Sequence, residues 1–407
     1  MVSALATLLV ALVFAPAAHA AGEAGTSGLN FLKIAAGPRA EAMGGAHVSV
    51  ADDAYAAYWN PGGLVQLRHP ELAAAHSQQM DGVSEQFVSY VYPFAGGRTV
   101  SASFTRLAVS PFDAYDNNGA RTGSVSSDDT AAGMAAAQAF SLPGEAAPVI
   151  GLGAGAQFVR ERLGSDSAST VVGDVGLWSG GWESWVGSWA KGARLGFAVR
   201  HLGPRVRFVS EQTRLPTTIA AGASVDKRVW GDPMTFAVEA ARTNNESAVV
   251  SLGGEYWVHR LIGLRLGLHR GSQEGVGFRF GLGMRIRVVQ VDYAFSNVGA
   301  LGNSHQVGMT FKFGVAPSAA GRSVAEHIQS ARDLLGQDRH YDAIQEAAEA
   351  LSEDPGNQEA ISLLREIKVD LQRSQDKGDQ DLIKRTEKKL DAEERKSRQK
   401  EEPNEPR

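Results

Sequence analysis

Large apolar residues alternate with small or polar ones along the chain between about residues 70 and 314. Over 276–285, for example, every second residue is large and apolar, and each residue between is glycine or arginine. Successive side chains of a β-strand point to opposite faces, so this period of two predicts strands with one apolar face. Counting such segments predicts fourteen strands, over 70–79, 83–94, 98–107, 130–141, 149–161, 168–178, 192–202, 216–226, 233–242, 247–258, 262–270, 275–285, 287–296 and 304–313.

The composition of the other, non-apolar face of these strands indicates whether the sheet lies in water or in a membrane. In a soluble sandwich that face meets water and carries many charges, whereas here glycine and small residues dominate it. Such a composition suits the crowded interior of a barrel whose apolar face turns to lipid, and in lipid a sheet must close on itself. We predict an all-β transmembrane barrel of about 14 antiparallel strands over residues 68–314, with a secreted β-sandwich or soluble barrel as the alternative.

An even strand number returns the chain to the side on which it started, which is the periplasmic side in bacterial barrels. The links predicted at 108–129 and 203–215 are then long extracellular loops. The link at 179–191 is long although it falls on the periplasmic side, and it carries Trp182, Trp185 and Trp189. Their spacing would place them on one side of a helical turn. We interpret them as an interfacial aromatic anchor, or as an ordinary girdle segment.

The first twenty residues predict a secretory signal peptide. An apolar run at 3–15 is followed by Pro16 and an Ala18-His19-Ala20 cleavage pattern, and this run is too short for a spanning helix. A buried N-terminal helix is the alternative, and the true start codon stays open because no basic residue precedes the run. The later chain offers no apolar helix of spanning length, so we expect export and location in the bacterial outer membrane.

Composition excludes several classes of function. The 407 residues include no cysteine, so disulfides, thiolate metal sites and a lipidated N-terminal cysteine are ruled out. A net charge of −5 is too mild for a nucleic-acid binder, and all of that excess lies in residues 322–407, with 16 Lys+Arg against 21 Asp+Glu. The histidines lack metal-ligand spacing, and no motif assembles a catalytic serine, histidine and aspartate. We therefore expect no metal, no cofactor, no catalytic residues and no enzymatic activity.

Two stretches resemble a known family. The first contains 28–34, Gly37-Pro38-Arg39-Ala40, 43–46, 51–53 and Tyr58-Trp59-Asn60-Pro61, and the second contains 254–257, 264–267, 292–295 and His305-Gln306. Together they resemble the PorV/PorQ family of outer-membrane proteins, relatives of the FadL-type long-chain fatty acid transporters, over about residues 28–314. Two departures are Gly62-Gly63 where the family shows Ala-Gly, and His201 where asparagine is common.

The resemblance implies a FadL-like 14-stranded barrel whose N-terminal segment folds into the lumen as a hatch. It also implies transport of hydrophobic molecules, or support of type IX protein secretion. We assign the hatch to residues 21–67, where glycines and prolines force tight turns and prevent one long strand. The alternative is that the 60–63 motif is merely a turn with an Asx-type side-chain bond. The residues of the predicted hatch motif are Arg39, Gly44, Gly45, Asp52, Asp53, Asn60 and Pro61.

Charged residues on the predicted lumen face are candidates for a second set of contacts. They either guide the carboxylate of a ligand, bind the hatch, or brace the barrel wall as a ladder of ion pairs, since buried charges demand partners. These lumen-lining candidates are Glu239, Glu255, Arg265, Arg279, Arg285, Asp292 and Lys312.

Beyond a linker at 315–322 the period becomes helical. Residues 323–375 predict three helices, with Ile344, Ala347, Ala348 and Leu351 on the apolar face of the second, and they resemble one and a half tetratricopeptide repeats. Residues 376–407 are nearly all polar or charged and predict a frayed or disordered tail. The module either docks on a partner or is a plain helical hairpin, and the even strand count places it in the periplasm.

Two functions compete at this level. In the first, the barrel transports or binds hydrophobic molecules, or supports secretion. In the second, the barrel is mainly an outer-membrane anchor, and residues 323–375 recruit a periplasmic or secretion-machinery protein. Outer-membrane lipid is an expected partner in both.

Overall fold

A computed structural model describes residues 27–79, 82–141, 149–208, 211–259, 261–271, 275–286, 288–297, 302–313, 324–336, 340–353 and 357–371. The predicted signal peptide, the linker at 315–322 and the charged tail at 376–407 lie outside the described residues. The chain divides into two compact units, Met1–Ala319 and Ala320–Arg407. Each unit is described by itself below.

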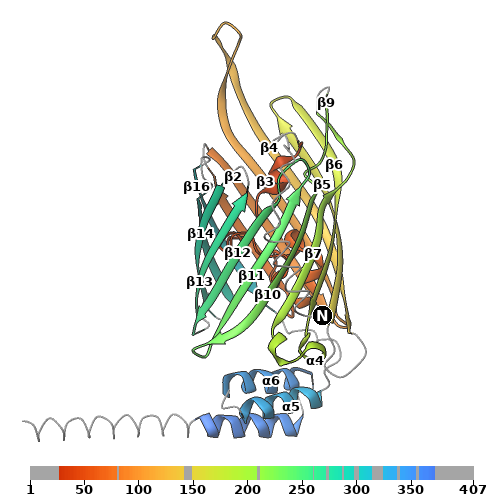
Figure 1. The fold of residues 1–407 in the computed structure, drawn as a ribbon, viewed down its shortest axis with the longest axis vertical. Coiled ribbons are helices and arrows are strands. Elements are labelled where there is room, and N and C mark those ends of the chain that lie inside the picture. The colour runs from red at the N-terminus through yellow and green to blue at the C-terminus, as the bar shows by residue number, and fades with distance from the viewer. Residues whose placement is uncertain are drawn as a thin grey trace, which may run out of the picture. The chain divides into compact units, whose positions relative to one another are not determined.

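The first unit is a closed β-barrel (Figure 1). Its strands follow one another around the wall in chain order, except that β7 is followed by β10. Every neighbouring pair, including β7 with β10, is antiparallel. The predicted closed barrel of fourteen antiparallel strands is confirmed. The strands of the wall are β1 (Glu71–Gln78), β2 (Val83–Phe94), β3 (Arg98–Tyr115), β4 (Arg121–Ser141), β5 (Val149–Leu163), β6 (Asp166–Gly180), β7 (Ala193–Leu202), β10 (Thr218–Val229), β11 (Asp232–Thr243), β12 (Val249–Val258), β13 (Ile262–Gly271), β14 (Gly275–Ile286), β15 (Val289–Asn297) and β16 (Asn303–Lys312).

The wall closes between its first and last strands. Glu71 lies opposite Lys312 in the register of β1 with β16, and Lys312 Nζ forms an ion pair of 2.7 Å with the Glu71 carboxylate. Each wall strand therefore has two neighbours, and no edge is left open. We call the end of the barrel at which β1 begins and β16 ends the proximal end, and the opposite end the distal end.

The two faces of the wall differ as the sequence pattern predicts. In β13, Leu264, Leu266 and Leu268 are exposed on the outside while Arg265 and Gly267 are buried inside. The outer face is an apolar belt of a size that soluble monomers do not expose, which favours a membrane barrel over a soluble one. Every wall strand contributes an exposed large apolar residue to it, for example Leu72, Val88, Phe104, Met134, Phe158, Val171, Phe197, Ile219, Phe236, Leu252, Leu266, Phe278, Val291 and Val307.

Three predicted links differ in the structure. Most of 108–129 is strand, because β3 continues to Tyr115 and β4 begins at Arg121, forming a long hairpin beyond the distal end (Figure 1). The 203–215 link contains a separate two-stranded sheet, β8 (Val206–Phe208) with β9 (Glu211–Thr213). The 179–191 link contains two short turns, α4 (Glu183–Val186) and η4 (Ser188–Ala190).

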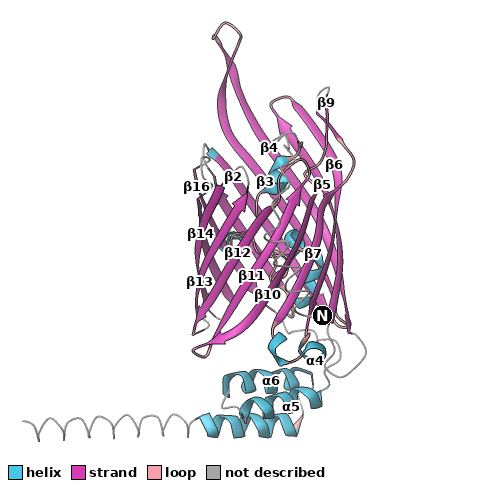
Figure 2. Ribbon diagram, viewed as in Figure 1, coloured by secondary structure: helices cyan, strands magenta, loops and turns pink. Residues whose placement is uncertain are grey.

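The N-terminal segment, residues 27–67, lies inside the barrel, where its short helices are enclosed by the strands (Figure 2). It consists of η1 (Asn30–Lys33), α2 (Pro38–Ala42), α3 (Ala56–Trp59) and η2 (Pro61–Gln66). Gly37 precedes α2 with φ 91°, a conformation that glycine adopts without strain. Most of the segment is buried although it is rich in polar residues, so the lumen wall must supply its partners.

The second unit contains α5 (Val324–Leu335), α6 (His340–Glu353) and a helix over 358–371. Their shared core is built from Ile328, Ala331, Ala343, Ala347, Ala350, Ala360, Leu363 and Ile367. Ala348, predicted on the apolar face of the second helix, is exposed, because Ala343, Ala347 and Ala350 form the buried stripe instead. No helix among the described residues is long and apolar enough to cross a membrane.

The apolar belt predicts a depth-dependent cost for an introduced charge. Leu266 is 72% exposed at the middle of β13 and Ile262 is 49% exposed at its proximal end. We expect Leu266→Arg to lower the free energy of unfolding in lipid vesicles by about 2–4 kcal/mol, and Ile262→Arg by at most about 1 kcal/mol. Urea titration of the folded barrel in vesicles measures both. Equal costs at the two positions would contradict a lipid-facing surface.

Candidate functional site

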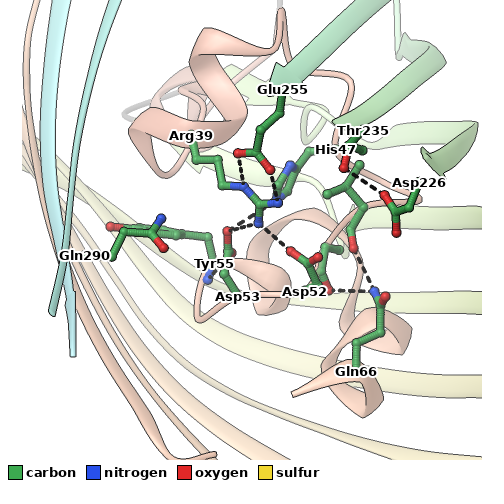
Figure 3. Close-up of polar contacts among 12 residues, drawn as sticks. Arg39, His47, Asp52, Asp53, Tyr55, Gln66, Asp226, Thr235, Glu255 and Gln290 are labelled. Carbon is green, nitrogen blue, oxygen red and sulfur yellow. Dashed lines mark hydrogen bonds and ion pairs between the residues drawn. The ribbon is translucent and has the colours of Figure 1, made fainter. Parts of the chain in front are cut away.

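Arg39 joins the N-terminal segment to the barrel wall. It is held at the start of α2, and its guanidinium donates two hydrogen bonds of 2.8 Å to the carboxylate of Glu255 in β12 (Figure 3). The same guanidinium forms ion pairs with Asp52 and, at 3.1 Å, with Asp53 (Figure 3). One arginine thus fixes two parts of the segment to each other and to the wall.

The wall side of this contact is itself a buried ion-pair cluster. Arg265 donates to Glu255 at 2.7 Å and to Asp292 at 2.7 Å, and it is 1% exposed. Arg285 lies over the ring of Trp257, with its guanidinium carbon 4.1 Å from the ring centroid. Such buried charges are stable only when each has partners, and here the wall residues leave one carboxylate, Glu255, shared with the segment.

Arg194 in β7 makes a second charged link between the segment and the wall. Its guanidinium donates to Asp52 at 3.2 Å and to Asp226 of β10 at 2.7 Å. Asp52 is therefore placed between Arg39 and Arg194, which come from different elements. Both arginine contacts lie toward the proximal end of the lumen, where β7 begins and β10 ends.

The surroundings lower the pKa of two acidic residues of the segment, Asp52 and Asp53. Burial alone raises the pKa of Asp53, but the neighbouring His47 and Arg39 outweigh that effect and hold it well below its usual range. Burial likewise raises the pKa of Asp52, while the charges of Arg39 and Arg194 lower it overall. These carboxylates stabilise the docked segment above the pKa of an unfolded aspartate, about 3.9, and protonation at lower pH removes that contribution.

Backbone groups of the segment are satisfied by wall side chains and by one asparagine. The Glu239 carboxylate accepts hydrogen bonds from the backbone N–H groups of His47 (2.8 Å) and Val48 (2.7 Å). The Asn60 side chain donates to the carbonyls of Val48 (2.8 Å) and Leu177 (2.9 Å) and accepts from Gly62 N–H (3.0 Å). Asn60 therefore both caps η2 and fixes it to β6.

Glycines of the wall leave room for the segment. A methyl group placed on Gly267 would lie 2.1 Å from the backbone nitrogen of Gly44, and one on Gly153 would lie 2.3 Å from Pro61. A methyl on Gly176 would lie 2.1 Å from the Asn60 side-chain oxygen. The glycine-rich inner face is thus shaped by close approach of the segment, which a larger side chain would prevent.

A cavity of about 410 Å³ remains above the segment, toward the distal end of the lumen. Hydroxyl, amide and charged side chains line most of it, together with the rings of Tyr58 and Trp59. Two charged residues of the segment that line this cavity form ion pairs. Lys33 pairs with Glu246 of a neighbouring loop at 2.6 Å, and Glu41 pairs with Arg279 of the wall at 2.9 Å.

An apolar cluster occupies another part of the lumen. The segment contributes Leu29, Phe31 and Leu32, each at most 5% exposed. They pack against lumen-facing residues of β3 to β6 and of the adjoining link, namely Leu107, Ala131, Val159, Ala168, Val172, Val206 and Leu215. The inner wall is therefore apolar along one side and polar along the other.

Most residues of the predicted hatch motif and lumen set lie in contact. Arg39, Asp52 and Asp53 join Glu255, Arg265 and Asp292 in one cluster, and Gly44, Asn60 and Pro61 lie against wall glycines. A methyl group placed on Gly45 would lie 3.6 Å from the Trp59 ring. Glu239 and Arg279 contact the segment separately, Arg285 contacts Trp257 and Gln290, and Lys312 lies at the closing pair.

Sequence reasoning missed Glu41, Arg194 and Arg200. The two arginines share the inner face of β7 with Gly196 and Ala198, and the residues between these four positions are Leu195, Phe197 and Val199. This is the same pattern that singled out Arg265 and Arg279, so the signal was present in the sequence. Within the described residues, no cluster of three or more His, Asp or Glu residues has the arrangement of a metal site.

The three tryptophans of 179–191 are near one another but do not share one helical side. The helix α4 ends at Val186, and Gly187 turns the chain with φ 109° before η4. Trp182 and Trp185 are in edge contact, with ring centroids 6.2 Å apart, while Trp189 donates its indole N–H to the Val186 carbonyl. Trp185 and Trp189 are 55% and 60% exposed at the proximal end.

No known family model matches this sequence, and no curated protein does. Solved structures of similar fold include the CymD monoaromatic hydrocarbon channel, at 13% identity and TM-score 0.46, covering 68% of this chain and 97% of that chain. The P. putida toluene transporter TodX has 12% identity and TM-score 0.46, with 68% and 98% covered. Outer membrane protein Omp33 of Acinetobacter baumannii has 11% identity and TM-score 0.37, with 60% and 98% covered.

Likeness at this level does not indicate what this chain binds, and the barrel assignment rests on its own strand pairing. Membership of the PorV/PorQ family and the tetratricopeptide character of the tail stay predictions.

The Arg39 cluster predicts that loss of this single side chain releases the segment. Because the chain has no cysteine, Ser49→Cys at a position 1% exposed reports opening through maleimide labelling without background. We expect Arg39→Met to leave buried carboxylates unpaired at a cost of about 3–5 kcal/mol, and so to speed labelling by at least about a hundredfold. Arg106→Met, which removes an exposed ion pair with Asp128, is the matched control and should change the rate little. Equal labelling in both variants would show that Arg39 does not hold the segment.

Proposed function

We propose that this chain is an outer-membrane barrel that binds or passes hydrophobic small molecules, with residues 21–67 acting as its hatch. The observation that carries the proposal is the N-terminal segment inside a closed wall, with an empty volume of about 410 Å³ on its distal side. A structural anchor needs no such chamber, because it would be stabilised by filling the lumen completely.

The manner of attachment supports a movable hatch. Within the described residues, no backbone–backbone hydrogen bond joins residues 29–67 to a wall strand, so the segment can leave without opening the barrel. It is held instead by side-chain ion pairs, by side-chain to backbone hydrogen bonds and by contact with wall glycines. Water entering the lumen can solvate such charged groups, which lowers the cost of separation relative to a dry core.

The apolar cluster supports an apolar passenger. Displacement of Leu29, Phe31 and Leu32 would uncover Leu107, Val159 and Val172 on the inner face of the wall. An apolar molecule would cover this surface again and recover the free energy of burial, at roughly 25 cal/mol per Å². A polar solute would gain nothing there, so the lumen favours passengers with an apolar body.

Assignment of the chain as an outer-membrane barrel also predicts which end of the barrel faces the periplasm and which faces outward. The short turns at Ala95-Gly96-Gly97 and at 230–231 lie at the proximal end, which we propose is periplasmic, and the long β3–β4 hairpin would face outward. Trp182, Trp185 and Trp189 would then form an aromatic anchor at the periplasmic interface. The chain leaves the wall after Lys312 at this end, which would place residues 315–407 in the periplasm.

A second candidate function is recruitment of a periplasmic or secretion-machinery protein by residues 323–375, with the barrel as anchor. The second unit has its own apolar core, and a hollow of about 650 Å³ lies beside Leu335, Leu363 and Val369. The lining also includes the charged residues Arg332, Arg365, Glu366 and Asp370, so the hollow could offer a partner both apolar and charged contacts. This role, including support of type IX secretion, is compatible with transport through the barrel.

Deletion of residues 28–67 tests the hatch. We expect the shortened barrel to conduct ions continuously in planar bilayers, and to admit a hydrophobic dye faster than the wild type, because the obstruction of the lumen is gone. Heat-modifiable migration in detergent gels would verify that the barrel still folds, and Arg106→Met serves as the flux control. Unchanged conductance and dye flux in a folded barrel would contradict the hatch.

Deletion of residues 322–407 tests recruitment. We expect the truncated barrel to fold and to keep its dye flux, while a protein that co-purifies with the full chain is lost. Quantitative mass spectrometry of both preparations measures the difference. The recruiting role would be rejected if both preparations contained the same partners.

A further inference from the structure

Although the charge of Glu239 acts on it, Arg200 is a buried cation with no directly bonded anion among the described residues. It lies on the inner face of β7, is 6% exposed, and forms no ion pair or hydrogen bond with any described residue. Its guanidinium carbon lies 5.3 Å from the ring centroid of Tyr58 and 5.2 Å from that of Trp59. These rings attract the cation but accept no conventional hydrogen bond from its five donors.

Arg200 is one of the residues that line the chamber. This cavity has a volume of about 410 Å³, and the Nε of Arg200 is buried without a partner. Two other cations that line the chamber are already paired, Lys33 of the segment with Glu246 and Arg279 of the wall with Glu41. Arg200 is thus the cation of the chamber, among the described residues, whose guanidinium has no direct hydrogen-bond or ion-pair partner.

Glu239 carries a carboxylate whose charge interacts with that of Arg200, but it takes up none of the hydrogen-bond donors of Arg200. Its Oε2 accepts two backbone hydrogen bonds from the segment, at 2.7 and 2.8 Å, and it forms no ion pair with Arg200. Glu239 also lines the chamber, so it opposes a bare anion and favours one that brings hydrogen-bond donors of its own. Hydroxyl groups such as those of Thr218 and Ser251 add further polar contacts.

We propose that this chamber binds a small hydrophilic anion, a carboxylate or phosphate that also carries hydroxyl or amino groups, with Arg200 as the residue that recognises the charge. An arginine fork matches the two oxygens of such an anion, and in a buried site this contact is strong. The inference goes beyond the proposed function, since it concerns a polar ligand and holds whether or not hydrophobic molecules pass.

Calorimetric titration of the full chain in detergent at low ionic strength tests the inference. D-glucuronate and D-glucose form a matched pair, because they differ chiefly in the carboxylate. We expect glucuronate to bind at least about tenfold more tightly than glucose to the wild type. Arg200→Met should weaken glucuronate binding by about tenfold or more, Arg200→Lys should weaken it less, and Arg98→Met at the proximal end should leave it unchanged. Indistinguishable binding of glucuronate and glucose by the wild type would overturn the inference without any variant.

Two further ligands, inorganic phosphate and octanoate, test which kind of anion the site accepts. They also separate this inference from the proposed function. Inorganic phosphate that competes with glucuronate and loses its affinity in Arg200→Met would support a site shared by both anions. Octanoate that binds equally to wild type and Arg200→Met, in the absence of any glucuronate or phosphate binding, would overturn the anion site while leaving passage of apolar molecules intact. Glucuronate binding that survives in a folded Arg200→Met barrel would also overturn it.

Discussion

The structure depends on one constraint, the requirement that a sheet in hydrocarbon leave no backbone hydrogen-bonding group without a partner. Pairing of β1 with β16 meets it by closing the wall, and closure divides the side chains of every strand between two surroundings. Large apolar side chains take the outside, as Leu266 and Phe278 do. The inside is left to glycine and charge, and this division creates the opportunity for a segment to be held within.

Glycine and charge hold that segment in complementary ways. Glycine removes side chains where backbone meets backbone, as at Gly267 against Gly44, and so sets the position of the segment closely. Charges such as Arg39 and Glu255 are stable in the lumen only as pairs, so each fixes the other's place. An interior of this kind differs from an apolar core, because its cohesion is strong when dry and weak when water enters.

The wall could be predicted from the sequence because its signal is local. Each strand shows its own alternation, and the fourteen expected segments correspond to the wall strands within a few residues except at β3 and β4. There the strands extend beyond the apolar belt, and residues 121–129 of β4 show no regular apolar face. An apolar face is required only where a strand contacts lipid, so the alternation cannot reveal the part of a strand that extends into water.

The contacts between residues in the lumen were harder to predict, since Arg39 and Glu255 are 216 residues apart and only the closed wall brings them together. Arg200 shows the limit most clearly, because its distinguishing feature is the lack of a direct ion-pair or hydrogen-bond partner among the described residues, which no pattern of residue types can reveal.

The seam between β1 and β16 also determines the order in which the molecule can be assembled. It joins residues 71 and 312, so the last hydrogen bonds of the sheet wait for the final strand, and folding is dominated by contacts of long sequence separation. The N-terminal segment runs directly into β1, yet ends up surrounded by strands made long after it. It is synthesised first and enclosed last, so its charged groups stay hydrated until the sheet curls around them. The interior is therefore wrapped, rather than inserted into a finished cylinder.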